Sequence, residues 1–266
     1  MFLARTGSGR SGAGRIGGAR DAVLGALVPL GVVGAWAFAS TQGGVLGVFL
    51  ATPGEVVAEF VRLLWSGELF SHVLASLSRV AVGLVTAILV GVPLGIGMGA
   101  WRSVDVAIAP LLDFLRPIPI AAWVPLTVLV FGIGELPARV LIFMGAIHPI
   151  VVNTILGVKG VKLLHVRAAR MLGADNWQVI RRVVIPSALP SVLAGIRLGL
   201  GIAWWVVIVA ELLAVRSGLG YMMVQAMALL RSDTMIVGIF VIGAVGLGLN
   251  RFAILTENLL MPWRKV

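Results

Sequence analysis

The chain contains no cysteine and few charged side chains. The absence of cysteine excludes disulfides, thiolate metal ligands and a cysteine nucleophile. Charged residues make up 12% of the 266 residues and hydrophobic residues 59%, whereas a soluble domain carries about 25% charged residues. The mean hydropathy is +1.06. This composition predicts a membrane protein whose fold is an all-α, polytopic bundle of transmembrane helices.

The sequence also lacks recognisable sites for nucleotides and metals. None of its three lysines follows the glycine-rich loop that cradles phosphates in ATP-binding proteins. The histidines His72, His148 and His165 lie in separate segments without the spacing of metal ligands. A packed position within the membrane explains His148 better than a proton relay does. We therefore expect no catalytic residues, no metal and no cofactor in this chain.

The net charge of +10 does not indicate a nucleic-acid partner. Basic residues in a nucleic-acid-binding protein gather on one face, whereas here they stand at the termini and between apolar runs. Two other causes explain this distribution better than nucleic-acid binding does. Lysine and arginine are retained in cytoplasmic loops of membrane proteins, and they contact anionic lipid. We expect membrane lipid, and no nucleic acid, among the partners.

The amino-terminal part divides into a basic tail and a first apolar run. Residues 1–21 are rich in Gly, Ser and Arg, which predicts a disordered cytoplasmic tail. Residues 22–266 form the predicted transmembrane domain. The apolar run Ala22–Ala39 is long enough to cross the bilayer. A signal peptide cleaved after Ala39 is the alternative, which we favour less.

Five further apolar runs bring the prediction to about six spans, with both termini in the cytoplasm. Between the first two spans, the segment opened by Thr52 predicts an external amphipathic helix. The second span is rich in glycine and should pack closely against its neighbours. Its cytoplasmic end is marked by Trp101, Arg102 and Asp105, and Asp113 and Arg116 bracket a short connecting segment. Three prolines predict a kinked third span after that segment. The five runs are residues 80–100, 118–133, 140–158, 188–215 and 235–255.

A basic segment, residues 161–187, separates the fourth and fifth spans. It predicts two short helices, because Gly173 suits a helix end and Asp175 with Gln178 forms a helix-start signal. Pro186 should stop the second helix, on which Trp177 and three aliphatic residues, Ile180, Val183 and Val184, fall at helical spacing. A helix lying on anionic lipid remains an alternative interpretation. Its basic residues, with Lys159 just before it, place the segment in the cytoplasm; they are Lys162, Arg167, Arg170, Arg181 and Arg182.

The same segment resembles the cytoplasmic loop of ABC-importer permeases. The similarity is carried by small residues and prolines, although Arg167 stands where that family usually has Glu and the spacing from Gly173 to Pro186 differs by one. Elsewhere FLRPIPIAAWVPL (114–126), FGIGE (131–135), AELL (210–213) and SGLGYM (217–222) resemble the nitrate, sulfonate and taurine branch. The residues of the loop that match are Ala168, Ala169, Gly173, Ala174, Ile185, Pro186 and Pro190.

This resemblance implies a permease subunit of an ATP-driven importer for a small anion such as a sulfonate, taurine, nitrate or bicarbonate. It also implies a second permease subunit, separate ATPase subunits that bind ATP and Mg²⁺, and an extracytoplasmic binding protein. An ATP-independent secondary transporter is the alternative, and a membrane enzyme a distant third. The residues that would dock the ATPase are Ala168, Ala169, Leu172, Gly173, Ala174 and Trp177.

Two ionisable residues within the fifth predicted span are candidates for a substrate path. Arg197 and Glu211 are 14 positions apart, about 21 Å along a helix, so they cannot pair directly. Charged groups at membrane depth often mark a pathway. The alternative is that each only holds the bundle together. Trp204 of the same span suits packing or a constriction.

Overall fold

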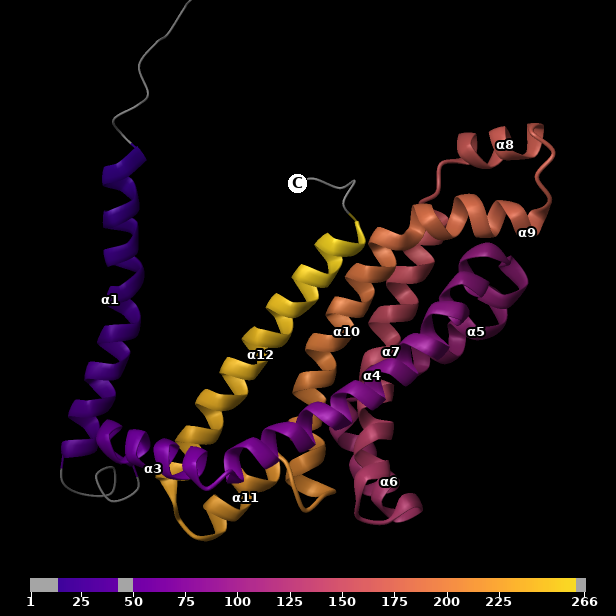
Figure 1. Cartoon of the computed structure of the whole chain (residues 1–266). Coiled ribbons are helices and arrows are strands. Elements are labelled where there is room, and N and C mark those ends of the chain that lie inside the picture. The colour runs from indigo at the N-terminus through magenta and orange to yellow at the C-terminus, as the bar shows by residue number, and fades with distance from the viewer. Residues whose placement is uncertain (1–13, 43–49, 262–266) are drawn as a thin grey trace, which may run out of the picture.

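The computed structural model describes residues 14–42 and 50–261, in which all regular elements are helical. Figure 1 shows α8 and α9 at one end of a helix bundle and α3, α6 and α11 at the opposite end. The helices are α1 (Gly14–Thr41), α3 (Pro53–Trp65), α4 (Glu68–Ala100), α5 (Arg102–Leu115), α6 (Val124–Phe131), α7 (Glu135–Lys159), α8 (Leu163–Met171), α9 (Asn176–Val179), α10 (Ile185–Leu213), α11 (Leu219–Ala228) and α12 (Ser232–Leu260). A 3₁₀ turn η1 (Ile120–Trp123) and a π-helical turn η2 (Ile180–Val184) complete them.

Helix α7 is the centre of the bundle, with α4 packed along one side and α10 along the other. Glycines permit this close approach. A Cβ at Gly95 of α4 would lie 2.6 Å from the Thr154 Cβ of α7, and one at Gly195 of α10 would lie 2.7 Å from the Asn153 Cβ. The expected close packing of the glycine-rich second span is therefore confirmed.

Four helices of the described residues are long and apolar enough to cross a membrane: α4, α7, the continuous helix Asn176–Leu213 and α12. A fifth span results if α5 and the η1–α6 segment, which are bent by 89°, count as one. About six spans were predicted, and the first of these lies in α1. Helix α1 begins within the expected tail, and residues 1–13 lie outside the described part of the chain.

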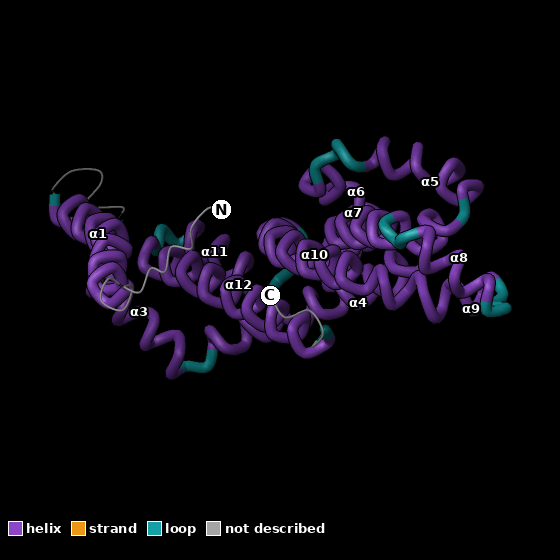
Figure 2. The backbone as a smooth tube through the Cα atoms, turned by 90° about the horizontal axis from the view of Figure 1, so that it is seen from above, coloured by secondary structure: helices purple, strands orange, loops and turns teal. Residues whose placement is uncertain are grey.

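Helix α1 stands apart from the other long helices in both views of the molecule (Figures 1 and 2). Its Trp36 donates an indole hydrogen bond to the Ala51 carbonyl, 3.1 Å away, just before α3. The helix expected after Thr52 is α3, and it begins with a capping box between Thr52 and Glu55. The carboxylate of Glu59 on this helix accepts from Arg62 at 2.7 Å and from Thr234 at 2.9 Å.

These contacts tie α3 to the start of α12. The Arg62 hydrogen bond is the largest influence on the pKa of Glu59, which falls to about 2. Arg231 adds an ion pair at 2.8 Å. Glu59 is therefore ionised at neutral pH, and α3 is fixed by charge as well as by its apolar side.

The residues between the second and third predicted spans form a helix, α5, which the prediction did not assign. Asp105 in its first turn pairs with Lys159 at the end of α7, with 2.6 Å between Nζ and Oδ2. An acidic side chain in the first turn also stabilises a helix start. The chain then bends through Pro117 and Pro119 before η1, so the predicted irregular start of the third span is confirmed.

The basic segment 161–187 contains the two predicted short helices, α8 and α9. Gly173, with φ of +84°, ends α8 in a Schellman motif, in which the Ala174 N–H bonds the Ala169 carbonyl at 3.0 Å. Asp175 and Gln178 form the predicted capping box of α9.

Pro186 does not stop the second helix, contrary to expectation. The chain passes from α9 through the π-helical turn η2 into α10, where Pro186 lies in the first turn. In η2 the Ile185 N–H bonds the Ile180 carbonyl, five residues back. The wider turn accommodates a residue that lacks an N–H, so the helix continues where an α-helical turn would be broken.

Candidate functional site

The segment 161–187 projects from one end of the bundle as a knob formed by α8 and α9 (Figure 1). Its tip exposes large apolar side chains: Leu172 is 88% exposed and Trp177 64%. Met171 is exposed beside Leu172, and Leu164 is exposed at the start of α8. Isolated exposed apolar residues are ordinary, but a cluster on a projecting element indicates a contact surface.

The six predicted docking residues divide into two groups. Ala168, Leu172, Gly173 and Trp177 are exposed. Ala169 and Ala174 face inward and pack against a small apolar cluster that joins the knob to the bundle. The spacing had suggested that Trp177 and Val184 lie on the same side of the second helix. Val184 is buried there, whereas Trp177 is exposed. The buried members of this cluster are Val158, Val179, Val184, Ala188 and Val192.

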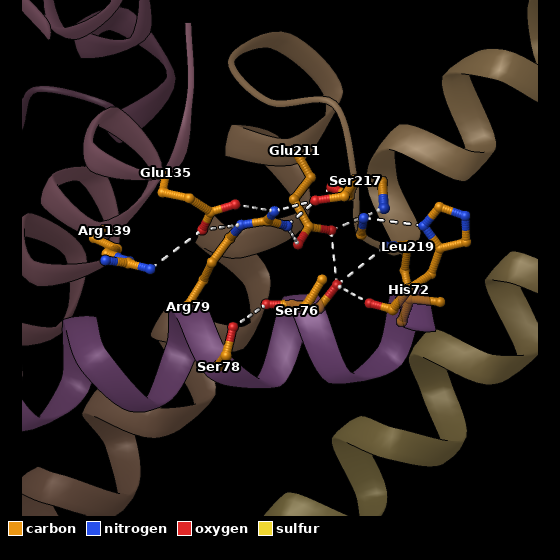
Figure 3. Close-up of polar contacts among 12 residues, drawn as sticks. His72, Ser76, Ser78, Arg79, Glu135, Arg139, Glu211, Ser217 and Leu219 are labelled. Atoms are coloured by element: carbon orange, nitrogen blue, oxygen red, sulfur yellow. Dashed lines mark hydrogen bonds and ion pairs between the residues drawn. The ribbon is translucent and has the colours of Figure 1, made fainter. Parts of the chain in front are cut away.

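The opposite end of the bundle contains a buried ionic cluster, which we call the Arg79 cluster: Arg79, Glu135, Glu211, Ser76 and Ser217 (Figure 3). The Arg79 side chain is 1% exposed. Its Nη1 lies 2.7 Å from Glu211 Oε1, and its Nη2 lies 2.5 Å from Glu135 Oε1. It also donates to the side chain and the carbonyl of Ser217. One guanidinium thereby joins α4, α7, α10 and the loop after α10.

The loop between α10 and α11 wraps around the Glu211 carboxylate. Oε2 of Glu211 accepts from Ser76 Oγ at 2.9 Å and from the Gly220 N–H at 3.0 Å. The Gly218 N–H donates to His72 Nδ1 at 3.0 Å. Gly218 has φ of +102°, and a Cβ there would lie 2.2 Å from Glu211 Oε1. Both the backbone angle and the space require glycine at this position.

Glu211, a candidate for the substrate path, is therefore fully buried and bound to Arg79. These contacts favour the alternative role, in which Glu211 holds the bundle together. Sequence reasoning did not place Arg79 in a cluster. Its position immediately before a long uncharged run was the one available signal.

Arg197 lies in a different environment, a cavity of about 560 Å³ between α10 and α12. Its side chain is 41% exposed and only loosely held: Nε lies 3.3 Å from Asn250 Oδ1, and Nη1 lies 3.8 Å from Glu257 Oε2. Both partners belong to α12. The guanidinium therefore retains donors that an anion could use.

Trp204 lies in the interface between α10 and α12. It is largely buried, and its Nε1 donates to the Ile242 carbonyl at 3.1 Å. A Cβ at Gly246 would lie 2.8 Å from that nitrogen. Of the two roles considered, these contacts favour packing. Among the described residues no group of His, Asp and Glu side chains could hold a metal ion.

A bundle of long apolar helices, with a knob projecting from one end, is the architecture of a membrane transport subunit. Residues 87–255 match the family described as binding-protein-dependent transport system inner membrane component. The chain belongs to this family. It is the multi-pass inner-membrane permease of an ABC importer in the sulfonate, taurine and nitrate group, and is not itself the catalytic component.

Curated relatives match most of the chain. A putative ABC transporter permease protein of Methanocaldococcus jannaschii is 42% identical over 79% of this chain and 79% of its own length. The putative aliphatic sulfonates transport permease protein of Bacillus subtilis is 37% identical over 90% and 87%. The taurine transport system permease protein of Escherichia coli is 35% identical over 86% and 85%.

Solved structures support the fold. The crystal structure of an amino acid ABC transporter with histidines matches with a TM-score of 0.61 at 16% identity. The match covers 75% of this chain and 97% of the other. The methionine ABC transporter MetNI in an inward-facing conformation matches with a TM-score of 0.59 at 18% identity, covering 72% and 96%. As a member of a binding-protein-dependent ABC system, the chain works with an ATPase and a binding protein.

Proposed function

We propose that two copies of this permease form a path for a small anion, and that ATPase subunits move the path by docking on the α8–α9 knob. The observation that carries the proposal is the exposed apolar tip of the knob, with Leu172 and Trp177 at its centre. Ala168 and Gly173 beside them are small enough for a helix to seat deeply in a groove of the partner. The ATPase would hold ATP and Mg²⁺, which this chain has no motif to bind.

The connection between the knob and α10 supports mechanical coupling. Residues Asn176–Leu213 form one continuous helix, which begins in the knob and carries Arg197 in its middle part. Ala169 and Ala174 pack the two halves of the knob onto that helix. A movement of the knob as a rigid body would therefore move α10, and with it one wall of the Arg197 cavity.

The distribution of charge supports cytoplasmic termini. The knob and the tail, residues 1–21, hold much of the basic charge, and the Arg79 cluster and α3 lie at the opposite end of the bundle (Figure 1). We therefore expect the binding protein to dock at the end where α3, α6 and α11 lie. Labelling of tags at Ser8, at Ser66 and after Lys265 measures the orientation: the first and last should be cytoplasmic and Ser66 external.

An ATP-independent secondary transporter is the competing function. Uptake into vesicles that contain the permease with its ATPase separates the two. We expect uptake to require ATP and to persist when ion gradients are collapsed. Uptake driven by a proton or sodium gradient without ATP would contradict the proposal.

Replacing Arg197 tests the path. The loose hydrogen bonds to α12 indicate that Arg197 offers a positive charge to a passing anion and is not a structural clamp. We expect Arg197→Lys to retain part of the transport, and Arg197→Ala to lose about tenfold or more, both at normal abundance. Uptake per assembled complex is the measurement. Arg251→Ala, an exposed arginine of α12 outside the cavity, is the control. Parental transport by Arg197→Ala would remove Arg197 from the path.

A further inference from the structure

A second cavity, of about 430 Å³, lies between the bend that follows α5 and the middle of α7, with α10 at its edge. Its wall is largely apolar and comes from three separate parts of the chain. Cavities of this size and composition commonly hold small organic ligands. The apolar side chains that form the wall are Leu112, Leu115, Ile118, Ile120, Phe143, Met144 and Ile147.

Two groups in this wall can carry positive charge, Arg116 and His148. Among the described residues, neither side chain has a hydrogen-bond or ion-pair partner. Arg116 and Asp113 are the charged side chains whose fields reach His148, and only Arg116 of these two lines the cavity. His148 lies 13 residues after the start of α7 and 11 before its end. His148 thus lies at the middle of a spanning helix, whereas Arg116 follows the last turn of α5 and is exposed. A cavity that brings these two unpaired donors together against an apolar wall can hold an anion.

This cavity adjoins the Arg197 cavity. Ile202 of α10 lines both of them, and Leu198 and Trp205 on the same helix are exposed. An anion leaving the surroundings of Arg116 could therefore reach Arg197 along one side of α10. The two arginines would be successive binding sites for the anion, separated by an apolar stretch of α10.

We propose that the Arg116 cavity binds the transported anion within the permease, and that it selects a small organic anion over a bare inorganic one. The inference rests on the proposed function. The charged head of the anion contacts the Arg116 guanidinium and His148, and its carbon chain lies against Ile118, Phe143 and their neighbours. A bare anion uses only the first contact. Each methylene buried against the wall should strengthen binding about fourfold.

Binding to the purified permease–ATPase complex in lipid nanodiscs, without the binding protein, tests this selection. The probes are nitrate, methanesulfonate and butanesulfonate, and calorimetry measures their dissociation constants. We expect butanesulfonate to bind at least tenfold more tightly than methanesulfonate, and nitrate most weakly. Arg116→Gln should weaken all sulfonates about tenfold, whereas Arg139→Gln, on α7 outside the cavity, should not.

The variant Ile118→Trp distinguishes an effect on the cavity from a general loss of fold. The larger side chain fills part of the space, so it should reduce the preference for butanesulfonate and leave methanesulfonate binding near the parental value. Equal binding of the three anions by the parental complex would overturn the proposal. Binding in detergent that disappears in nanodiscs would also overturn it, because lipid would then occupy the cavity. If ATP-driven uptake persists in either case, only the cavity assignment fails. If no anion is taken up with ATP, the proposed function fails as well.

Discussion

Replacing Arg79 with methionine is expected to remove most of the folded permease from the membrane. The side chain is 1% exposed and is shared by Glu135 and Glu211. Its loss would leave the fully buried carboxylate of Glu211 without an opposite charge, which costs about 3–5 kcal/mol in comparable buried pairs. A protein with a total stability of roughly 5–15 kcal/mol tolerates little of this. Membrane abundance and the thermal midpoint in detergent are the measurements.

Two controls attribute this effect to the buried charge. Arg139→Met removes the other arginine that pairs with Glu135, at 3.5 Å, but Arg139 and Glu135 are both partly exposed, so little change is expected. The double variant Arg79→Met with Glu211→Leu removes both buried charges and should recover part of the lost abundance. If Arg79→Met alone melted at the parental temperature, the Arg79 cluster would not stabilise the fold.

The helices were largely predictable because their causes are local. Long apolar runs, the capping residues Thr52 and Asp175, and the Schellman glycine Gly173 all act within a few residues of the chain. The glycines of α4 were informative for the same reason, since their spacing indicates which side of a helix can approach another.

The errors arose where the tertiary structure overrode a local sequence signal. Pro186 is a strong helix breaker by itself, but the π-helical turn η2 accommodates it within a helix that is packed on both sides. Helix α5, which the sequence prediction did not assign, has Asp105 in its first turn within 2.6 Å of Lys159 at the end of α7. Contacts between distant residues are not visible in a single sequence.

The Arg79 cluster shows this limit most directly. Arg79 and Glu211 are separated by 132 positions, and Arg79 and Glu135 by 56. Sequence reasoning correctly noted that Arg197 and Glu211 cannot pair, but could not supply the partner of either. The structure supplies both, with Arg79 for Glu211 and Glu257 for Arg197. The tightness of the first pair favours a structural role for Glu211, and the looseness of the second supports the path role that we propose for Arg197.

Leu172→Asp is expected to uncouple transport while leaving the permease folded. Leu172 is 88% exposed and ends α8 at the tip of the knob, so a charge there costs the isolated permease little. In a docked complex the same residue would lie in an apolar groove of the ATPase, where a buried carboxylate without a partner is costly. ATP-driven uptake should fall about tenfold or more, and co-purification of the ATPase should fall with it.

Leu163→Asp is the matched control, because it makes the same chemical change in the same helix. Leu163 is nine residues before Leu172, which places it about 180° around α8, and it is also exposed. If the tip of the knob enters the ATPase, Leu163→Asp should retain both uptake and the ATPase. If α8 instead lies along an anionic lipid surface, neither variant should lose the ATPase. Loss of uptake by Leu172→Asp with the ATPase still bound would separate coupling from docking, and would place the docking contact elsewhere on the knob.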